Sequence, residues 1–449
     1  MPNCQLQTGN WKLVTATPVI IVGASAAGLH AACLLAGAGV PVYVLDERGG
    51  PAAAARTLIV TPRLRRALGD LPQEAIVNQT PVLQLFSPGA EASIRLNEPD
   101  WVVERARLMP WLIRRARAAG AEYVPGQRFV GLEPDHDGLV VHLESSTGRR
   151  ESLIAHMLIG ADGAFSQVAQ AIRQVRPPSS AGAPPQTTRP NAQGHAAVYN
   201  LQARVALPAW ARVDTTQVWF DPRATRYFFW LIPESRQSAV VGLIADDERS
   251  ARAELGRFLA AHALQALEMQ GGQVPLYAHN GAPEARIAGA RVYLVGDAAA
   301  HVKVTTVGGL VTGLRGAQAA ARAILQRTSY AQELGRLRRE LDGHLWIRRV
   351  LNCFGPGDFD QLLRLVNGRA QRVLAARTRD EALHALLGAL LAQPGFLLLA
   401  ARAMASRCAG RSLAEEIAPS RRTQDAESAG RQLPRNHPET THNAEGRGD

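Results

Sequence analysis

Residues 19–29 read VIIVGASAAGL, and this stretch decides the fold. Its first four residues form the apolar run of a short buried strand, and Ala26–Ala38 continues as a small-residue helix. Gly23 permits the tight turn between strand and helix, and Gly28 lets the two elements pack closely. A second apolar strand follows at Val42–Leu45, so the segment predicts a βαβ unit of a parallel, Rossmann-type sheet.

The turn in this unit has the chemistry of a dinucleotide site, because its backbone N–H groups and the positive helix end would face a pyrophosphate. The usual G-x-G-x-x-G pattern carries Ser25 in place of its middle glycine, and the serine hydroxyl can hydrogen-bond a phosphate oxygen. Asp46 ends the second strand 23 residues after Gly23, where a carboxylate can accept the adenosine ribose hydroxyls. A glycine-rich turn that binds nothing remains the alternative for this motif alone.

Two later segments repeat the same design. Leu158–Ser166 and Tyr293–Ala299 each contain a buried strand, and the strands end in the turns Asp162-Gly163 and Gly296-Asp297. Such turns supply the acceptors and N–H donors that the hydroxyls and phosphates of a dinucleotide require. One such turn is common in any protein, but three in this order are specific.

The rest of the chain predicts a mixed α/β protein with a second lobe. Four β-branched or aromatic runs indicate an antiparallel sheet, and they are His195–Val205, Gln217–Phe220, Tyr227–Ile232 and Ala239–Ile244. We expect a discontinuous nucleotide domain (18–175 with 275–330), a sheet domain for the substrate (195–274) and a C-terminal helical region (331–417). Residues 1–17, 176–194 and 418–449 are expected to be loosely ordered.

Composition excludes several classes of protein. The net charge is +11, but its arginines are spread along the chain without interleaved aromatic residues, so we expect no nucleic-acid partner. The four cysteines are scattered, which predicts neither a metal site nor a disulfide framework and favours a cytoplasmic protein. The apolar stretch Leu383–Ala405 is too interrupted to span a membrane. It could contact the inner membrane face peripherally or form a packed helical hairpin.

With its three turns, the chain resembles the FAD-dependent oxidoreductases that include aromatic hydroxylases, flavin halogenases and geranylgeranyl reductases, over about residues 18 to 350. The resemblance implies a glutathione-reductase-like FAD domain. In that group the first turn, here Gly23, Ser25, Ala27 and Gly28, binds the ADP part of FAD together with Asp46. Asp162-Gly163 would serve FAD and, in hydroxylases, NAD(P)H, and Gly296-Asp297 would hold the ribityl-phosphate region. The same analogy assigns Arg56 and Arg105 to the FAD phosphates, with exposed helix arginines as the alternative.

Residues 301–311, HVKVTTVGGLV, discriminate best among the branches of this group. Gly308 and Gly309 would let the backbone approach the isoalloxazine, and the helix that starts there would direct its positive end at the flavin N1–C2 region. Geranylgeranyl reductases tend to read K-x-T-T-x-G-G here, as this chain does, although proline and glycine are typical at Val304 and Val307. Hydroxylases usually carry an asparagine at the position of Val311.

A second marker is the strand Tyr227–Pro233, which resembles the strand that lines the substrate side in reductases and halogenases. The resemblance places Tyr227, Trp230 and Pro233 at the substrate, and a plain core strand is the alternative. Halogenases use a lysine beyond the nucleotide fold, and neither lysine of this chain is placed for that role.

The sequence therefore predicts an FAD-dependent, geranylgeranyl reductase-like oxidoreductase that acts on a small apolar, isoprenoid-like substrate, with NAD(P)H as the electron donor. One alternative is an NAD(P)H-dependent monooxygenase that hydroxylates an aromatic or polyketide-like substrate, and another is a flavin-binding protein without enzymatic activity. His301 and Lys303 are the titratable residues expected near the flavin edge. His301 would donate a proton, unless it is structural, and Lys303 would stabilise the flavin anion.

Overall fold

All four residues of the short strand Val19–Val22 are buried, and their side chains point alternately to the two faces of a sheet. The computed structural model describes residues 18–50, 56–175, 196–278, 283–381, 388–389 and 391–407. Val19 and Ile21 point into one hydrophobic core, and Ile20 and Val22 point into another, so both faces of the strand are covered. The expected loose segments 1–17, 176–194 and 418–449 lie outside the described residues.

A six-stranded sheet forms the nucleotide lobe, in the order β16-β17-β10-β1-β2-β6. Five neighbouring strands are parallel, and the edge strand β16 is antiparallel. The strands are β1 (Val19–Val22), β2 (Val42–Asp46), β6 (Glu122–Pro125), β10 (Met157–Gly160), β16 (Glu284–Ile287) and β17 (Ala290–Leu294). The three strands that precede the glycine turns, β1, β10 and β17, are therefore adjacent although they are far apart in the sequence.

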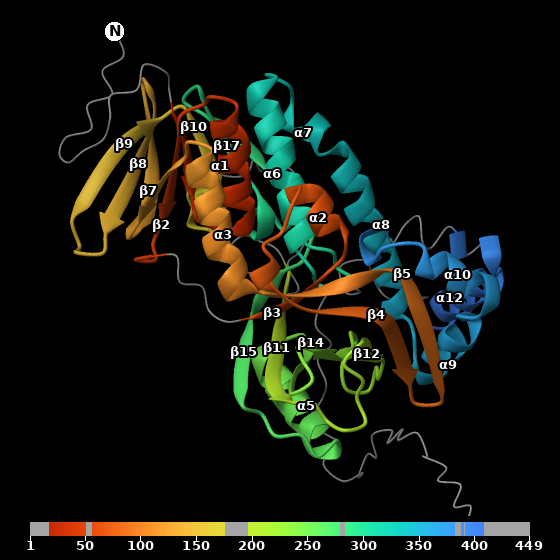
Figure 1. The fold of residues 1–449 in the computed structure, drawn as a ribbon. Coiled ribbons are helices and arrows are strands. Elements are labelled where there is room, and N and C mark those ends of the chain that lie inside the picture. The colour runs from red at the N-terminus through yellow and green to blue at the C-terminus, as the bar shows by residue number, and fades with distance from the viewer. Residues whose placement is uncertain are drawn as a thin grey trace, which may run out of the picture.

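The two faces of this sheet are covered differently (Figure 1). The helices α1 (Ala26–Gly37), α3 (Arg105–Ala118) and α6 (Leu310–Leu325) pack together on one face. The opposite face packs against a three-stranded sheet, formed by β7 (Gln127–Asp135), β8 (Gly138–Ser145) and β9 (Arg150–Ala155), and against α4 (Gln167–Val175). The first core thus joins strands to helices, and the second joins the two sheets.

An eight-stranded sheet forms the second lobe, in the order β15-β11-β14-β13-β12-β4-β5-β3. Its strands from the expected sheet domain are β11 (Ala197–Ala206), β12 (Thr215–Trp219), β13 (Phe229–Pro233), β14 (Ser238–Ala245) and β15 (Glu268–Pro275). The helix α5 (Glu248–Ala261) covers one face of this sheet with apolar residues such as Leu255 and Phe258. All strand pairs described in it are antiparallel except β12 with β4.

One domain boundary needs correction. The whole segment 18–175 was assigned to the nucleotide domain, but β3 (Thr57–Val60), β4 (Ile76–Ser87) and β5 (Ala90–Glu104) complete the eight-stranded sheet. The connection depends on parallel pairing of Val82 with Thr215, far away in the sequence. Local sequence patterns cannot predict this pairing, because the two strands become neighbours only in the folded sheet.

The C-terminal region is helical where it is described. Its helices are α7 (Tyr330–Glu333), α8 (Gly335–Asn352), α9 (Pro356–Leu365), α10 (Gly368–Ala375) and α12 (Gly395–Arg407), with the 3-10 turn η3 (Arg379–Glu381). Helices α9 and α10 pack against β5, at the end of the long β4–β5 hairpin (Figure 1). Among the described residues, no helix is long and apolar enough to cross a membrane.

The cysteines differ from the sequence expectation in one respect. Cys33 is free and half-buried on α1. Cys353, just after α8, is disulfide-bonded, which the scattered spacing of the cysteines did not predict. The described part of the chain contains no cluster of three or more His, Cys, Asp or Glu side chains that could hold a metal ion.

Candidate functional site

A cavity of about 380 Å³ lies between the two large sheets. Ser25 and Ala27 reach it from the start of α1, and Gly163 reaches it from the turn after β10. Gly296 and Asp297 come from the short 3-10 turn η2 (Gly296–Ala299) that follows β17. The three glycine turns predicted from the sequence therefore meet at one site. The opposite wall is built by β3, β11, β12 and β13 of the eight-stranded sheet.

Of the residues expected at the site, ten line this cavity, and they are Ser25, Ala27, Arg56, Arg105, Gly163, Gly296, Asp297, Lys303, Gly308 and Gly309; Trp230 joins them from the substrate strand. Gly23, Gly28, Asp46, Asp162, Tyr227, Pro233 and His301 do not line it. The distinction separates residues that can contact a ligand from residues that shape the turns behind it.

Gly23 and Gly28 belong to the second group, because they let the first and second turns touch. Gly23 has a φ of +97°, and a Cβ there would lie 2.6 Å from the carbonyl oxygen of Ala161. A Cβ at Gly28 would clash with the carbonyl oxygen of Gly23 and lie 2.9 Å from the Ala161 side chain. Ser25 caps α1, since its Oγ accepts a hydrogen bond of 3.2 Å from the backbone N–H of Gly28. Its own hydroxyl proton is still available for a phosphate oxygen.

The two acids outside the cavity are engaged with the protein. Asp46 is buried and accepts hydrogen bonds of 3.1 Å from both Nε and Nη2 of Arg48, and one of 3.2 Å from the Tyr123 hydroxyl. Asp162 accepts from the backbone N–H of Val168 at the start of α4, and burial raises the pKa of its carboxyl. The ribose and flavin roles of these two acids stay predictions. Arg48, which sequence reasoning missed, stands two residues beyond the end of β2.

Arg56 and Arg105 form a cationic wall. Burial lowers the pKa of both guanidinium groups, and the positive charges of Arg48 and Arg56 lower the pKa of Arg105 further. Within the described chain neither forms an ion pair, and the nearby negative charge that offsets them both is Asp297. Burial raises the pKa of the Asp297 carboxyl, and the two arginines lower it. Two cations that share one buried carboxylate suit an added anion, so this wall fits a pyrophosphate.

The third turn supports the start of α6. Gly309 is the N-cap residue of this helix and offers no side-chain hydrogen bond to its first N–H groups. A Cβ at Gly309 would lie 2.9 Å from Oδ1 of Asp297, and one at Gly313 would lie 3.2 Å from the Cα of Gly296. The bare positive end of α6 therefore faces the cavity beside Asp297. This arrangement fits the electron-rich edge of a flavin ring.

The loop before α6 separates the two titratable residues expected at the flavin edge. Lys303 lines the cavity, and its side chain lies over Gly308, where a Cβ would be 3.3 Å from the lysine Cε. His301 lies behind the loop, because its ring packs against α6 so closely that a Cβ at Gly316 would clash with it. The structure thus places Lys303, and not His301, in contact with the cavity.

Strand alternation sorts the residues of the substrate strand. Phe228, Trp230 and Ile232 share the face that lines the cavity. Tyr227 has the opposite parity, and the Arg348 guanidinium lies 4.7 Å from the centre of its ring. Pro233, the last residue of β13, also has the opposite parity. The period of two was visible in the sequence and would have selected Phe228 and Ile232 over the two end residues.

Other cavity residues carried no sequence signal. Asn200, Gln202 and Thr216 come from β11 and β12, and Asp380 comes from η3. None of these four residues belongs to a sequence motif, and several helices separate Asp380 from Lys303 along the chain. Only the folded chain brings them together.

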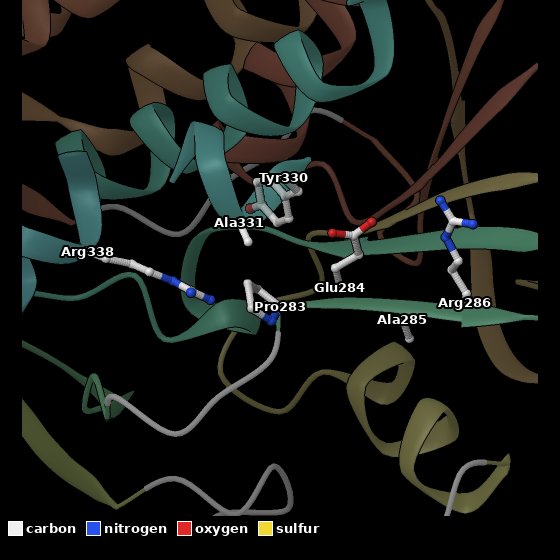
Figure 2. A pocket seen from close by; sticks show the side chains of 7 residues that line it. All are labelled: Pro283, Glu284, Ala285, Arg286, Tyr330, Ala331 and Arg338. Carbon is white, nitrogen blue, oxygen red and sulfur yellow. The ribbon is translucent and has the colours of Figure 1, made fainter. Parts of the chain in front are cut away.

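A second hollow opens at the edge strand β16 (Figure 2). It is lined by Pro283, Glu284, Ala285, Arg286, Tyr330, Ala331 and Arg338. The hollow contains none of the glycine turns and no residue of the eight-stranded sheet. Tyr330 points its hydroxyl to the carbonyl oxygen of Leu294, at 2.8 Å, and so supports the end of β17. We therefore assign the chemistry to the first cavity.

Comparisons with known proteins agree with this geometry. The FAD binding domain family matches residues 16–333. Digeranylgeranylglycerophospholipid reductase 1 of Methanothermobacter thermautotrophicus is 25% identical over 78% of this chain and 90% of its own. The chloroplastic geranylgeranyl diphosphate reductase of Oryza sativa is 26% identical over 68% of this chain and 66% of its own. A geranylgeranyl bacteriochlorophyll reductase-like protein of Thermoplasma acidophilum superposes with a TM-score of 0.70 and 18% identity, over 86% of this chain and 99% of that structure. The resemblance and the fold class inferred from the sequence are confirmed.

Replacing Asp297 by alanine should reduce FAD retention several-fold, because the variant removes from the cavity the hydrogen-bond acceptor that is predicted to hold the ribityl region of FAD. FAD content is measured from the flavin absorbance after desalting. Asp221→Ala is the control, since Asp221 is a buried aspartate that is paired with Arg223 and lies outside this cavity. Equal FAD content in Asp297→Ala and Asp221→Ala would contradict the role given to Asp297.

Proposed function

The chain belongs to the FAD binding domain family and is an FAD-dependent oxidoreductase, and from that premise we propose that it reduces carbon–carbon double bonds of an isoprenoid-like substrate. The observation that carries the proposal is the loop Lys303–Gly309, which keeps the pattern of the geranylgeranyl reductases and lines the cavity at the start of α6. Bound FAD, once reduced by NAD(P)H in this proposal, supplies a hydride to the alkene. The names of the relatives support an isoprenoid substrate.

The wall opposite the loop suits a hydrocarbon chain. Apolar surface is presented to the cavity by Trp230 and Ile232 of β13, Phe228 just before it, Val218 of β12 and Val274 of β15. Burying such a chain against this wall is worth about 0.8 kcal/mol per methylene group.

Polar atoms interrupt the apolar wall at one end. The indole Nε1 of Trp230 and Oδ1 of Asn200 are buried atoms without a hydrogen-bond partner among the described residues. Gln202 beside them is already engaged, since its Nε2 donates to the Thr57 carbonyl and to Gln270. A buried donor and acceptor left open in a cavity favour a ligand that pairs with them. We therefore extend the proposal to an apolar substrate that carries a polar group at one end.

Gly242 determines how Trp230 lies in this wall. It pairs with Trp230 across β13 and β14, and a Cβ there would be 2.7 Å from Cε2 of the indole. The ring therefore lies flat over the glycine, on the face of the sheet that also carries Gln202. This placement keeps the Nε1 edge close to the sheet surface and leaves room for a substrate above the ring.

A monooxygenase is the second candidate, because the open polar atoms of Trp230 and Asn200 also suit a ring that carries hydroxyl or carbonyl groups. The two reactions differ in their requirement for oxygen and in the product. A reductase adds two hydrogens to the substrate, and a monooxygenase adds one oxygen atom.

The proposed reaction predicts turnover without oxygen. The FAD-loaded protein is reduced anaerobically with NADPH or NADH and mixed with a geranylgeranyl lipid, and the flavin absorbance should return as the double bonds become saturated. Mass spectrometry of the lipid measures the added hydrogen. A protein incubated without lipid should stay reduced and serves as the control. If the flavin stays reduced until oxygen is admitted, and the lipid gains oxygen, the reductase proposal is wrong.

Trp230→Phe should raise the KM for a substrate with a polar end by about three- to tenfold, because it removes one hydrogen-bond donor worth about 1 kcal/mol and keeps the aromatic surface. FAD retention should not change. Trp219→Phe is the matched control, since Trp219 is buried in the core on the other face of the sheet, against Phe86 and Phe258. Equal KM values for the two variants would count against the polar contact.

We further propose that α12 and the residues just before it contact a membrane, from which an isoprenoid lipid could enter. Leu397 and Leu398 of α12 are 55% and 74% exposed, and Leu391, which precedes the helix, is 86% exposed. Substituting all three by serine should reduce co-flotation with anionic vesicles several-fold and leave FAD content unchanged. Leu267→Ser, at a leucine that is 66% exposed next to β15, is the control. Equal flotation of the triple variant and the control would rule the contact out.

A further inference from the structure

One acid from the C-terminal region reaches the flavin-side loop. Asp380 lies in η3, and its Oδ1 forms an ion pair with Nζ of Lys303. Its Oδ2 accepts a hydrogen bond from the hydroxyl of Thr61, just after β3. Asp380 is fully buried and Lys303 is 8% exposed, yet all three residues line the cavity. The carboxylate thus joins the loop to the opposite lobe.

The segment that carries Asp380 is fixed by a second ion pair. Glu381 binds Nη2 of Arg63 at 2.8 Å, and the same arginine contacts Glu340 of α8 at 3.3 Å. The backbone N–H of Thr378 also donates to the Glu381 carboxylate, at 3.3 Å. These contacts dock residues 378–381 onto the start of the helix α2 (Arg63–Leu68). Asp380 is therefore held in place independently of Lys303.

A buried ion pair needs a reason other than stability, because the desolvation of two charges offsets most of their attraction. The cation of this pair is a lysine, and lysine is rare in this chain. Lysine occurs at two positions in the chain, Lys12 and Lys303, among 50 basic residues. Lys303 Nζ lies 3.4 Å from where a Cβ of Gly308 would be, so its compact ammonium is next to the backbone of this glycine. Lys303 therefore places a compact positive charge beside Gly308 and Gly309.

We propose that Asp380 is a positioning residue, which holds the Lys303 ammonium against the Gly308–Gly309 edge of the flavin site and partly offsets its charge. The pair then sets how readily the bound flavin is reduced. A cation at this edge favours the reduced, anionic flavin, and the carboxylate behind it moderates the effect. The inference requires bound FAD but no particular substrate, so it stands or falls separately from the proposed reaction.

The neighbouring His344 adds no positive charge next to Lys303. His344 on α8 is buried, and its Nδ1 lies 2.7 Å from the Thr305 hydroxyl. Burial, and then the positive charge of Lys303, lower the pKa of His344 to about 3. The imidazole is therefore neutral at physiological pH, and the charges that line the cavity near Gly308 and Gly309 are those of Lys303, Asp380 and, beside Gly309, Asp297.

The test compares flavin reduction in four full-length, FAD-loaded proteins: wild type, Lys303→Met, Asp380→Asn and the double variant. Each is reduced slowly and anaerobically together with a reference dye, which gives the equilibrium constant between flavin and dye. Asp380→Asn keeps an oxygen for Lys303 but removes the negative charge, so it should shift the equilibrium towards reduced flavin by at least about tenfold. Lys303→Met should shift it towards oxidised flavin by a similar factor, and the double variant should lie between the two single variants.

Thermal unfolding of the same proteins tests the pairing itself. Each single variant leaves one buried charge unpaired, so each should unfold at a lower temperature than the double variant. Asp221→Asn is the control, because it removes the charge of a buried carboxylate that is paired with Arg223 outside the cavity and leaves the Lys303–Asp380 pair intact. It should leave the flavin–dye equilibrium within about twofold of wild type.

Two results would overturn the inference. One is a flavin–dye equilibrium in Lys303→Met and Asp380→Asn that matches the Asp221→Asn control or shifts in the same direction in both. The other is a double variant that is no more stable than either single variant, and this readout applies even where a single variant loses FAD.

Discussion

The close approach of two strand-to-helix turns is the constraint on which the rest of the structure depends. Gly23 and Gly28 let the turn after β1 touch the backbone of Ala161 after β10, with no room for a side chain between them. Because β17 pairs with β10 on its other side, the third turn is carried to the same place. Three separated segments then open on one cavity. A single added Cβ at this contact would move apart the groups that face the dinucleotide.

Charge burial is the second consequence of this arrangement. Arg56 and Arg105 are held where burial lowers the pKa of both groups, and Asp297 offsets them. Such a cluster is costly in the absence of an anion and favourable in its presence. At the other end of the cavity Lys303 and Asp380 form a balanced pair. The site thus carries two arginines at the expected phosphate end and the Lys303–Asp380 pair at the expected ring end, and Asp297 lies beside Gly309 between the two groups.

Local patterns in the sequence predicted the parts of the fold that depend on neighbouring residues. The βαβ unit, the three turns and the strands of the second lobe follow from periods of two and 3.6 residues and from glycine positions. The membership of β3, β4 and β5 in the second sheet did not follow, because it depends on pairing across a long stretch of chain. The same limit applies to the site. Lys303 belongs to a motif and could be predicted, whereas Asp380 reaches it only through the packing of the C-terminal helices. His301 is expected at the flavin edge because it is two residues from Lys303 in the sequence. The turn after β17 instead directs its ring towards α6.

One departure from the reductase pattern has a structural meaning. Glycine is typical in that branch at the position of Val307, and Val307 has a φ of +51°, in the region that a branched side chain avoids. The glycine of the relatives is therefore explained by backbone geometry, and valine costs about 1–3 kcal/mol at such a position. Val307 is buried and lines the cavity next to Gly308. The chain accepts this strain and places an apolar branch in the cavity that Lys303 also lines. The branch of Val307 therefore lines the same cavity as Trp230 and Asn200, whose buried polar atoms have no hydrogen-bond partner among the described residues.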